Sequence, residues 1–208
     1  MVAAEKDQIS FTVMYATHNA FRRDLDRFAA AVDAGRAGSP EVAAGWDNFK
    51  HQLHVHHTVE DAELWPRVEA AVAERPADLE LMAEMEAEHA VLNPLMEQVD
   101  SALATQAPDL ADRVGKLSTA LGDHMAHEEK SALPLIQEVL TVKDWAAFRT
   151  GMARAQGPRG AATYIPWIMD GVGDEGRRAF LAEMPPPVKV INRVFLQSRY
   201  QKRHYWGS

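Results

Sequence analysis

The sequence reads His56-His-Thr-Val-Glu-Asp-Ala-Glu-Leu-Trp-Pro66, and 68 residues later it reads His124-Met-Ala-His-Glu-Glu-Lys-Ser-Ala-Leu-Pro134. Both stretches follow one pattern: His, three residues, Glu, an acidic residue, four residues, Pro. A chance second copy of so long a pattern is improbable in a chain of this length. We therefore interpret the two stretches as equivalent parts of an internal repeat.

Hydrophobic periodicity predicts that both copies lie on helices. Apolar residues recur at every third or fourth position through residues 7–140, and sustained period-two alternation is absent. We expect the second helix to run from about Pro40 to Ala73, the third to start near Pro76 and the fourth near Pro108. Four long amphipathic helices with short connections predict an all-α fold, an antiparallel up-down four-helix bundle.

Each copy of the repeat follows a helix that carries a histidine on its apolar face, His18 before the first copy and His89 before the second. Within each copy, His and Glu are four residues apart and therefore share a helix face. Burying bare carboxylates in a bundle core is costly unless they pair or bind a cation. The pattern predicts a site for two metal ions with these ligands: His18, His56, Glu60, His89, His124 and Glu128. Imidazole and carboxylate without thiolate suit iron, manganese or zinc.

Other polar residues near these positions have less defined roles. His57 and His127 each adjoin a predicted ligand in the sequence and lie about 100° around the helix from it, so we interpret them as neighbours of the site, as alternative ligands or as solvated side chains. Asp61 and Glu129 are expected beside the site or at the surface. Two further histidines of the second helix, His51 and His54, are expected at the surface.

At these residues the chain resembles the hemerythrin-like, His-His-Glu cation-binding family. The family pattern is a histidine on the first helix, His-x-x-x-Glu on the second, a histidine on the third and His-x-x-x-Glu or Asp on the fourth, and the likeness covers about residues 8–140. The resemblance implies two iron ions with an oxo or hydroxo bridge. It also implies that His18 and His56 hold one iron, that His89 and His124 hold the other, and that both glutamates bridge.

The chain departs from the oxygen-carrying hemerythrins at one position. Those proteins have a further histidine one turn before the third-helix histidine, where this sequence has Met85. Glu86, Tyr15 or water can substitute for it, or the position stays open. Open coordination positions favour reactivity over simple reversible carriage of oxygen.

Composition excludes several other functions. The 208 residues carry a formal charge of -8, which disfavours sequence-independent nucleic-acid binding. The absence of cysteine excludes disulfides, zinc fingers and Cys-ligated clusters. No stretch is apolar enough to predict a transmembrane segment, and the N-terminal residues lack the order of a signal peptide. We therefore expect a cytoplasmic protein.

The pattern changes after residue 140, and we predict a helical extension over residues 141–208 rather than a second catalytic domain. A short helix is expected before Gln156, with others over 163–170 and 174–183. The end of the chain, from Pro185, is basic and aromatic, with five Lys or Arg and no acid. It is interpreted as a packed helix with a solvated edge, as a lid over the metals, or as a contact for an anionic partner.

The leading hypothesis is a non-heme di-iron protein that binds or reduces O2, H2O2 or NO, with peroxidase-like or catalase-like activity. The alternatives are an oxidase or oxygenase whose organic substrate is enclosed by the extension, and an iron or oxygen sensor without turnover. Iron rests on the family likeness, since the ligand set alone also fits manganese or zinc.

Overall fold

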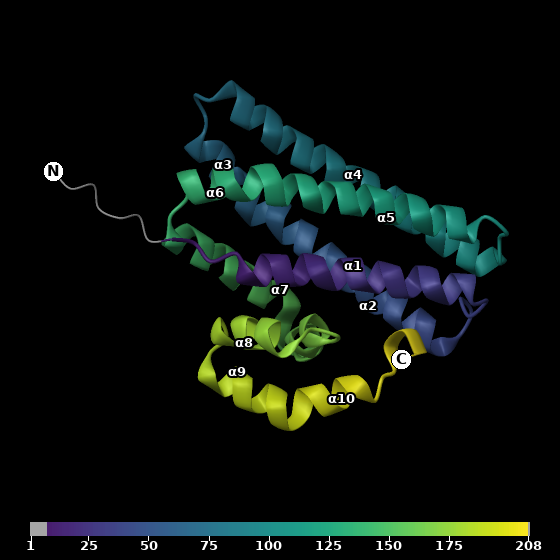
Figure 1. Ribbon diagram of the computed structural model, residues 1–208. Helices are drawn as coiled ribbons and strands as arrows, with labels where there is room; N and C mark the ends of the chain where they lie inside the picture. The colour runs from purple at the N-terminus through teal and green to yellow at the C-terminus, as the bar shows by residue number, and fades with distance from the viewer. Residues whose placement is uncertain (1–7, 208) are drawn as a thin grey trace.

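The computed structural model describes residues 8–207, which form helices and connections without a strand. Figure 1 shows that successive long helices run in opposite directions. They are α1 (Thr12–Asp33), α2 (Pro40–Val59), α4 (Pro76–Thr105) and α5 (Leu110–His127). The all-α prediction is confirmed, as are the starts of the second and third long helices. Residues 1–7, on which the expectation about a signal peptide rests, lie outside the described residues.

A π-helical turn begins at each repeat glutamate. These turns are η1 (Glu60–Leu64) and η2 (Glu128–Ala132), after which the chain continues as α3 (Trp65–Ala71) and α6 (Leu133–Val139). The first residue after each turn donates its backbone N–H to the carbonyl of the glutamate five residues back. Pro66 and Pro134 come next, and proline has no N–H and crowds the carbonyl four residues back. The single unbroken helix expected from Pro40 to Ala73 is therefore interrupted.

The apolar core consists of two clusters. One contains Phe21, Phe49, Leu53, Leu92 and Leu121 with their neighbours. The other contains residues that lie on the opposite side of the repeat histidines along the same helices: Met14, Val59, Leu64, Met82, Met85, Leu133 and Ile136. The predicted metal ligands thus lie in a polar layer between two apolar clusters, and both clusters hold the four helices together around it.

The first part of the extension packs along the bundle. α7 (Val142–Met169) continues through the position where a break was expected, but Gly157 has φ +59° and kinks it there. Before the kink, Trp145 and Phe148 join the cluster that contains Met85. After it, Trp167 joins the cluster that contains Phe21. α7 therefore runs beside the polar layer and contacts both α1 and α2.

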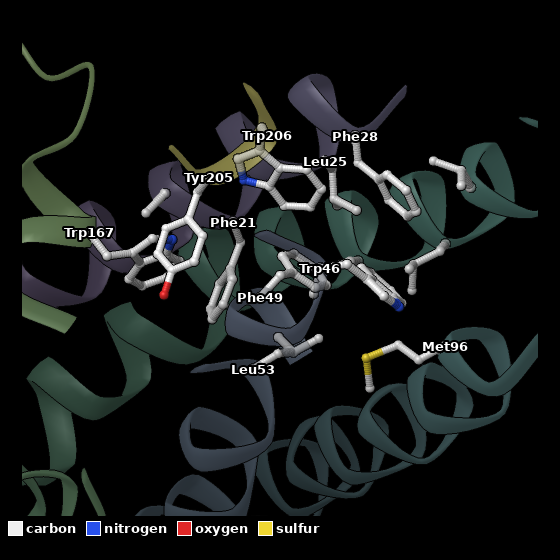
Figure 2. Packing of buried hydrophobic residues seen from close by; sticks show 14 of the residues in the cluster. Phe21, Leu25, Phe28, Trp46, Phe49, Leu53, Met96, Trp167, Tyr205 and Trp206 are labelled. Carbon is white, nitrogen blue, oxygen red and sulfur yellow. The ribbon is translucent and has the colours of Figure 1, made fainter. Parts of the chain in front are cut away.

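The rest of the extension forms an outer layer, visible at the bottom of Figure 1. It comprises α8 (Asp174–Ala182), α9 (Pro186–Ile191), η3 (Asn192–Leu196), α10 (Gln197–Gln201) and η4 (Tyr205–Gly207). Figure 2 shows Trp167, Tyr205 and Trp206 against aromatic residues of α1 and α2. The indole N–H of Trp167 donates to buried Asp24 at 2.7 Å. Among the described residues, no helix is both long and apolar enough to cross a membrane.

The first prediction concerns the packing of Trp206 against Gly45. A Cβ on Gly45 of α2 lies 2.5 Å from the Trp206 ring, so Gly45→Ala is expected to destabilise the fold by about 1–3 kcal/mol through overpacking. Urea denaturation measures this. The matched control is Gly115→Ala on the exposed face of α5, where the added Cβ meets nothing within 4 Å and should stabilise by about 0.5–1 kcal/mol. An equal change in the free energy of unfolding for the two variants contradicts the close packing of Trp206 on Gly45.

Candidate metal centre

The four histidines predicted as ligands converge in the bundle core. The Nε2 atoms of His18 and His56 lie 3.3 Å apart, and those of His89 and His124 lie 3.0 Å apart. Two nitrogens bound at about 2.0–2.1 Å to one ion are separated by roughly 2.8–3.4 Å for bond angles between 90° and the tetrahedral value. Each pair of rings therefore fits one metal ion.

Each repeat glutamate lies between one ring of each pair. Glu60 Oε1 is 3.3 Å from His56 Nε2, and its Oε2 is 3.8 Å from His89 Nε2. Glu128 Oε2 is 3.1 Å from His18 Nε2 and 4.0 Å from His124 Nε2. Both carboxylates are therefore placed where one group can reach two ions.

Both glutamates are fully buried, and none of their four oxygens meets hydrogen-bond geometry with a donor, in spite of the short contact to His18. Buried carboxylates without donors are costly in a metal-free core. A divalent cation supplies the missing charge and the missing partner. This observation, together with the ring distances, shows that the residues present fit a metal centre.

Carboxylates hold the outer nitrogens of three of the rings. The Nδ1–H groups of His18, His89 and His124 donate to Glu129 at 2.8 Å, Asp61 at 2.7 Å and Glu88 at 2.9 Å. A carboxylate can only accept, so each Nδ1 carries the proton and each Nε2 is free to bind a metal. Asp61 and Glu129 were expected near the site. Glu88 was missed, because it lies beside His89 in the sequence but serves the histidine of another helix.

The remaining candidate residues are placed differently from one another. His57 is buried among the ligand rings, whereas His127 is about 30% exposed and donates to Glu88 at 2.8 Å. Tyr15 and Glu86, proposed as substitutes at the Met85 position, are exposed. His51 and His54 are also exposed.

Within residues 8–207, three groups of side chains place donor atoms within 4.8 Å of one another, and all their members are buried. They are His18 with His56 and Glu128, His57 with His89 and His124, and His56 with His57 and Glu60. All six predicted ligands occur in these groups. His57 is the one further member.

The charges of the metal-free centre are coupled. Burial alone lowers the pKa of His18, but the charges of Glu128 and Glu129 and the hydrogen bond to Glu129 outweigh it and raise this pKa to about 9. For Glu128, burial opposes ionisation, yet the charge on His18 wins and lowers its pKa. Burial and the charge of Glu128 raise the pKa of Glu60 well above its usual value. Burial and the neighbouring rings lower the pKa of His56.

α7 closes the α1 side of this layer. The hydroxyls of Tyr164 and Thr17 are hydrogen-bonded at 2.7 Å, and Thr17 immediately precedes His18. Burial raises the pKa of Tyr164 to about 12, and the charge of Glu60 adds to the shift. The phenol is thus a neutral side chain from the extension, placed next to the ligand helix.

A family model supplies the decisive comparison. The hemerythrin HHE cation-binding domain matches residues 10–136, more than half of the chain. The chain belongs to the hemerythrin HHE cation-binding family. No curated protein and no solved structure matches it. In this HHE domain the matched residues span α1 to α6, which contain all six predicted ligands.

The raised pKa of His18 predicts that metal binding depends on pH. At pH 7 His18 holds a proton that an incoming ion displaces, because its pKa of about 9 lies above this pH. The apparent affinity for Mn²⁺ should rise by about 10-fold per pH unit between pH 6.5 and 8.5 from this proton alone. Calorimetry in buffers of different ionisation enthalpy measures the released proton. An affinity that stays constant over this range contradicts the His18–Glu128 pair.

A further prediction concerns the stability of the metal-free protein. Because the pKa of Glu60 is raised on folding, its contribution to stability is present below the unfolded value and is lost as the pH rises. In chelator, Glu60→Gln should therefore raise Tm at pH 7.5 by at least about 2 °C, with a smaller gain at pH 5. Calorimetric melting at both pH values tests this. A lower Tm than wild type at pH 7.5 excludes a destabilising carboxyl at this position.

Proposed function

We propose that this HHE protein holds two iron ions in its bundle core and binds or reduces O2, H2O2 or NO there. The observation that carries the proposal is the pair of buried, donor-free carboxylates, each placed between rings of both histidine pairs. His18 and His56 bind one ion, His89 and His124 bind the other, and Glu60 and Glu128 bridge. Iron, when bound, supplies the electrons and the coordination positions for a small diatomic molecule or peroxide.

The protein's own residues orient the ligands and keep the centre dry. Glu129, Asp61 and Glu88 fix the proton of three rings on Nδ1 and so direct Nε2 inward. The apolar clusters on both sides exclude bulk water from the polar layer. The site is thus suited to a small ligand that needs no large binding pocket.

The oxidase alternative calls for an apolar pocket that connects the extension to the metals. A hollow of about 700 Å³ does lie between α2, α7 and the end of the chain. Its lining residues include Asp47, Asn48, Gln52, Gln156 and Arg159, and none of the six predicted metal ligands is among them. The hollow therefore does not connect the extension to the predicted metal ligands, so we place the small-ligand function first.

The test is the metal content of the purified protein, together with its visible spectrum after reduction and after O2, H2O2 or NO. We expect about two irons per chain, and loss of the di-iron spectrum in His56→Ala, because His56 contacts both His18 and Glu60. His54→Ala, an exposed histidine of the same helix, is the matched control and should keep the metals. An unchanged iron content in His56→Ala refutes the ligand assignment.

The spectral response then separates binding from turnover. A spectrum that returns on removal of O2 or NO supports reversible binding, and consumption of H2O2 supports peroxidase-like or catalase-like activity. Zinc in place of iron after growth in iron-supplemented medium contradicts the redox function.

A further inference from the structure

His57 has no counterpart in the second copy of the repeat. The position after the repeat histidine is His57 in the first copy and Met125 in the second. Met125 is buried in the apolar cluster around Phe21, as a methionine in a core is expected to be. The two halves are therefore chemically unequal at this position.

The ring of His57 lies among the ligand rings. It is stacked on His89, with ring centroids 3.9 Å apart and planes at 16°, and it meets His124 edge-on at 5.3 Å. These three histidines form one of the groups whose nitrogens lie within 4.8 Å of one another. α2 therefore contributes two imidazoles to the polar layer, where the ligand face alone predicted one.

The Nε2 atom of His57 is buried and has no hydrogen-bond partner. The outer nitrogens of His18, His89 and His124, in contrast, each have a carboxylate. A buried imidazole nitrogen without a partner is unfavourable, and native structures avoid it unless water or an ion completes it. His57 offers donor atoms within 4.8 Å of those of His89 and His124, and also of those of His56 and Glu60, so its ring lies in the same layer as the predicted ligands.

Another position near His89 lacks a donor. Met85, one turn before His89, is buried and has no nitrogen to offer, and Tyr15 and Glu86 are exposed. We propose that His57 is a third imidazole ligand of the ion held by His89 and His124. It takes the place of the further third-helix histidine for which this chain has Met85. The inference rests on the proposed metal centre and deepens it.

One consequence is that the two ions differ. The ion at His89 and His124 has three imidazoles, whereas the ion at His18 and His56 has two, because Met125 is the residue that corresponds to His57. The second ion keeps more open coordination positions. A diatomic ligand would then have more coordination positions at the ion held by His18 and His56. Thr17, whose hydroxyl is hydrogen-bonded to that of Tyr164, directly precedes His18.

The experiment compares wild type with His57→Phe, which retains an aromatic ring against His89 but has no nitrogen. Metal-free protein is titrated with Fe²⁺ under anaerobic conditions against a competing chelator. We expect the wild type to bind two ions tightly, and His57→Phe to bind one ion tightly and the other with an affinity lower by about 10-fold or more. Loss of a residue that only hydrogen-bonds a metal ligand already lowers metal affinity by about 10–100-fold. His54→Phe, on the exposed face of α2, should behave as wild type.

A second measurement counts the ligands directly. In the Co²⁺-loaded protein, each bound imidazole with a ring N–H gives a solvent-exchangeable, paramagnetically shifted proton resonance. His57→Phe should show one fewer such resonance than wild type. Met85→His in the His57→Phe background should restore the second tight ion, because residue 85 lies one turn from His89 on the same face.

The outcomes separate the two proposals. Wild-type protein that binds no divalent ion overturns both the proposed function and the role of His57. Wild type and His57→Phe that bind two ions with equal affinity, and with equal numbers of shifted resonances, overturn only the role of His57. Far-ultraviolet circular dichroism of the metal-free variants checks the fold. If His57→Phe is unfolded, His57→Gln replaces it in the titration, and the affinities of the two ions are compared with wild type in the same way.

Discussion

The repulsion and desolvation of Glu60 and Glu128 oppose folding of the metal-free bundle, and the rest of the structure is arranged around that cost. Two apolar clusters on either side hold the helices together independently of the polar layer. One proton on His18 offsets one of the two charges. The protein thus keeps a site that is unfavourable by itself but well matched to cations, as metal sites commonly are.

The π-helical turns explain how one sequence pattern can serve both the site and the core. Each turn adds one residue between the glutamate and the following proline, so the helix face shifts by about 100° at that point. Glu60 and Glu128 stay on the ligand face, while Trp65 and Leu133, directly after the turns, are buried in the cluster around Met85. The proline of the repeat therefore helps to place the predicted ligands, although it lies six residues after the glutamate.

Much of this was predictable because its causes are local. The spacing of apolar residues gives the helices, and a His–Glu pair four residues apart gives the ligand face. The π turns escaped prediction because the second helix was expected to run without interruption from Pro40 to Ala73, through Pro66. Glu88 escaped because it serves His124, which lies on another helix. His57 was a candidate whose role stayed open, because the ring that it packs on, His89, also lies on another helix. The part of the extension in the core also depends on long-range packing, since Trp206 fits α2 only where Gly45 leaves room.

The carboxylates on the outer nitrogens have a further consequence, which concerns access of protons. The rings of His18, His89 and His124 are buried. The side chains of their respective partners, Glu129, Asp61 and Glu88, are 22%, 44% and 33% exposed. Each of these rings is therefore separated from bulk water by a single carboxylate. Changes of charge at the bundle centre can be balanced by proton exchange at the surface, without opening the helices and without wetting the apolar clusters.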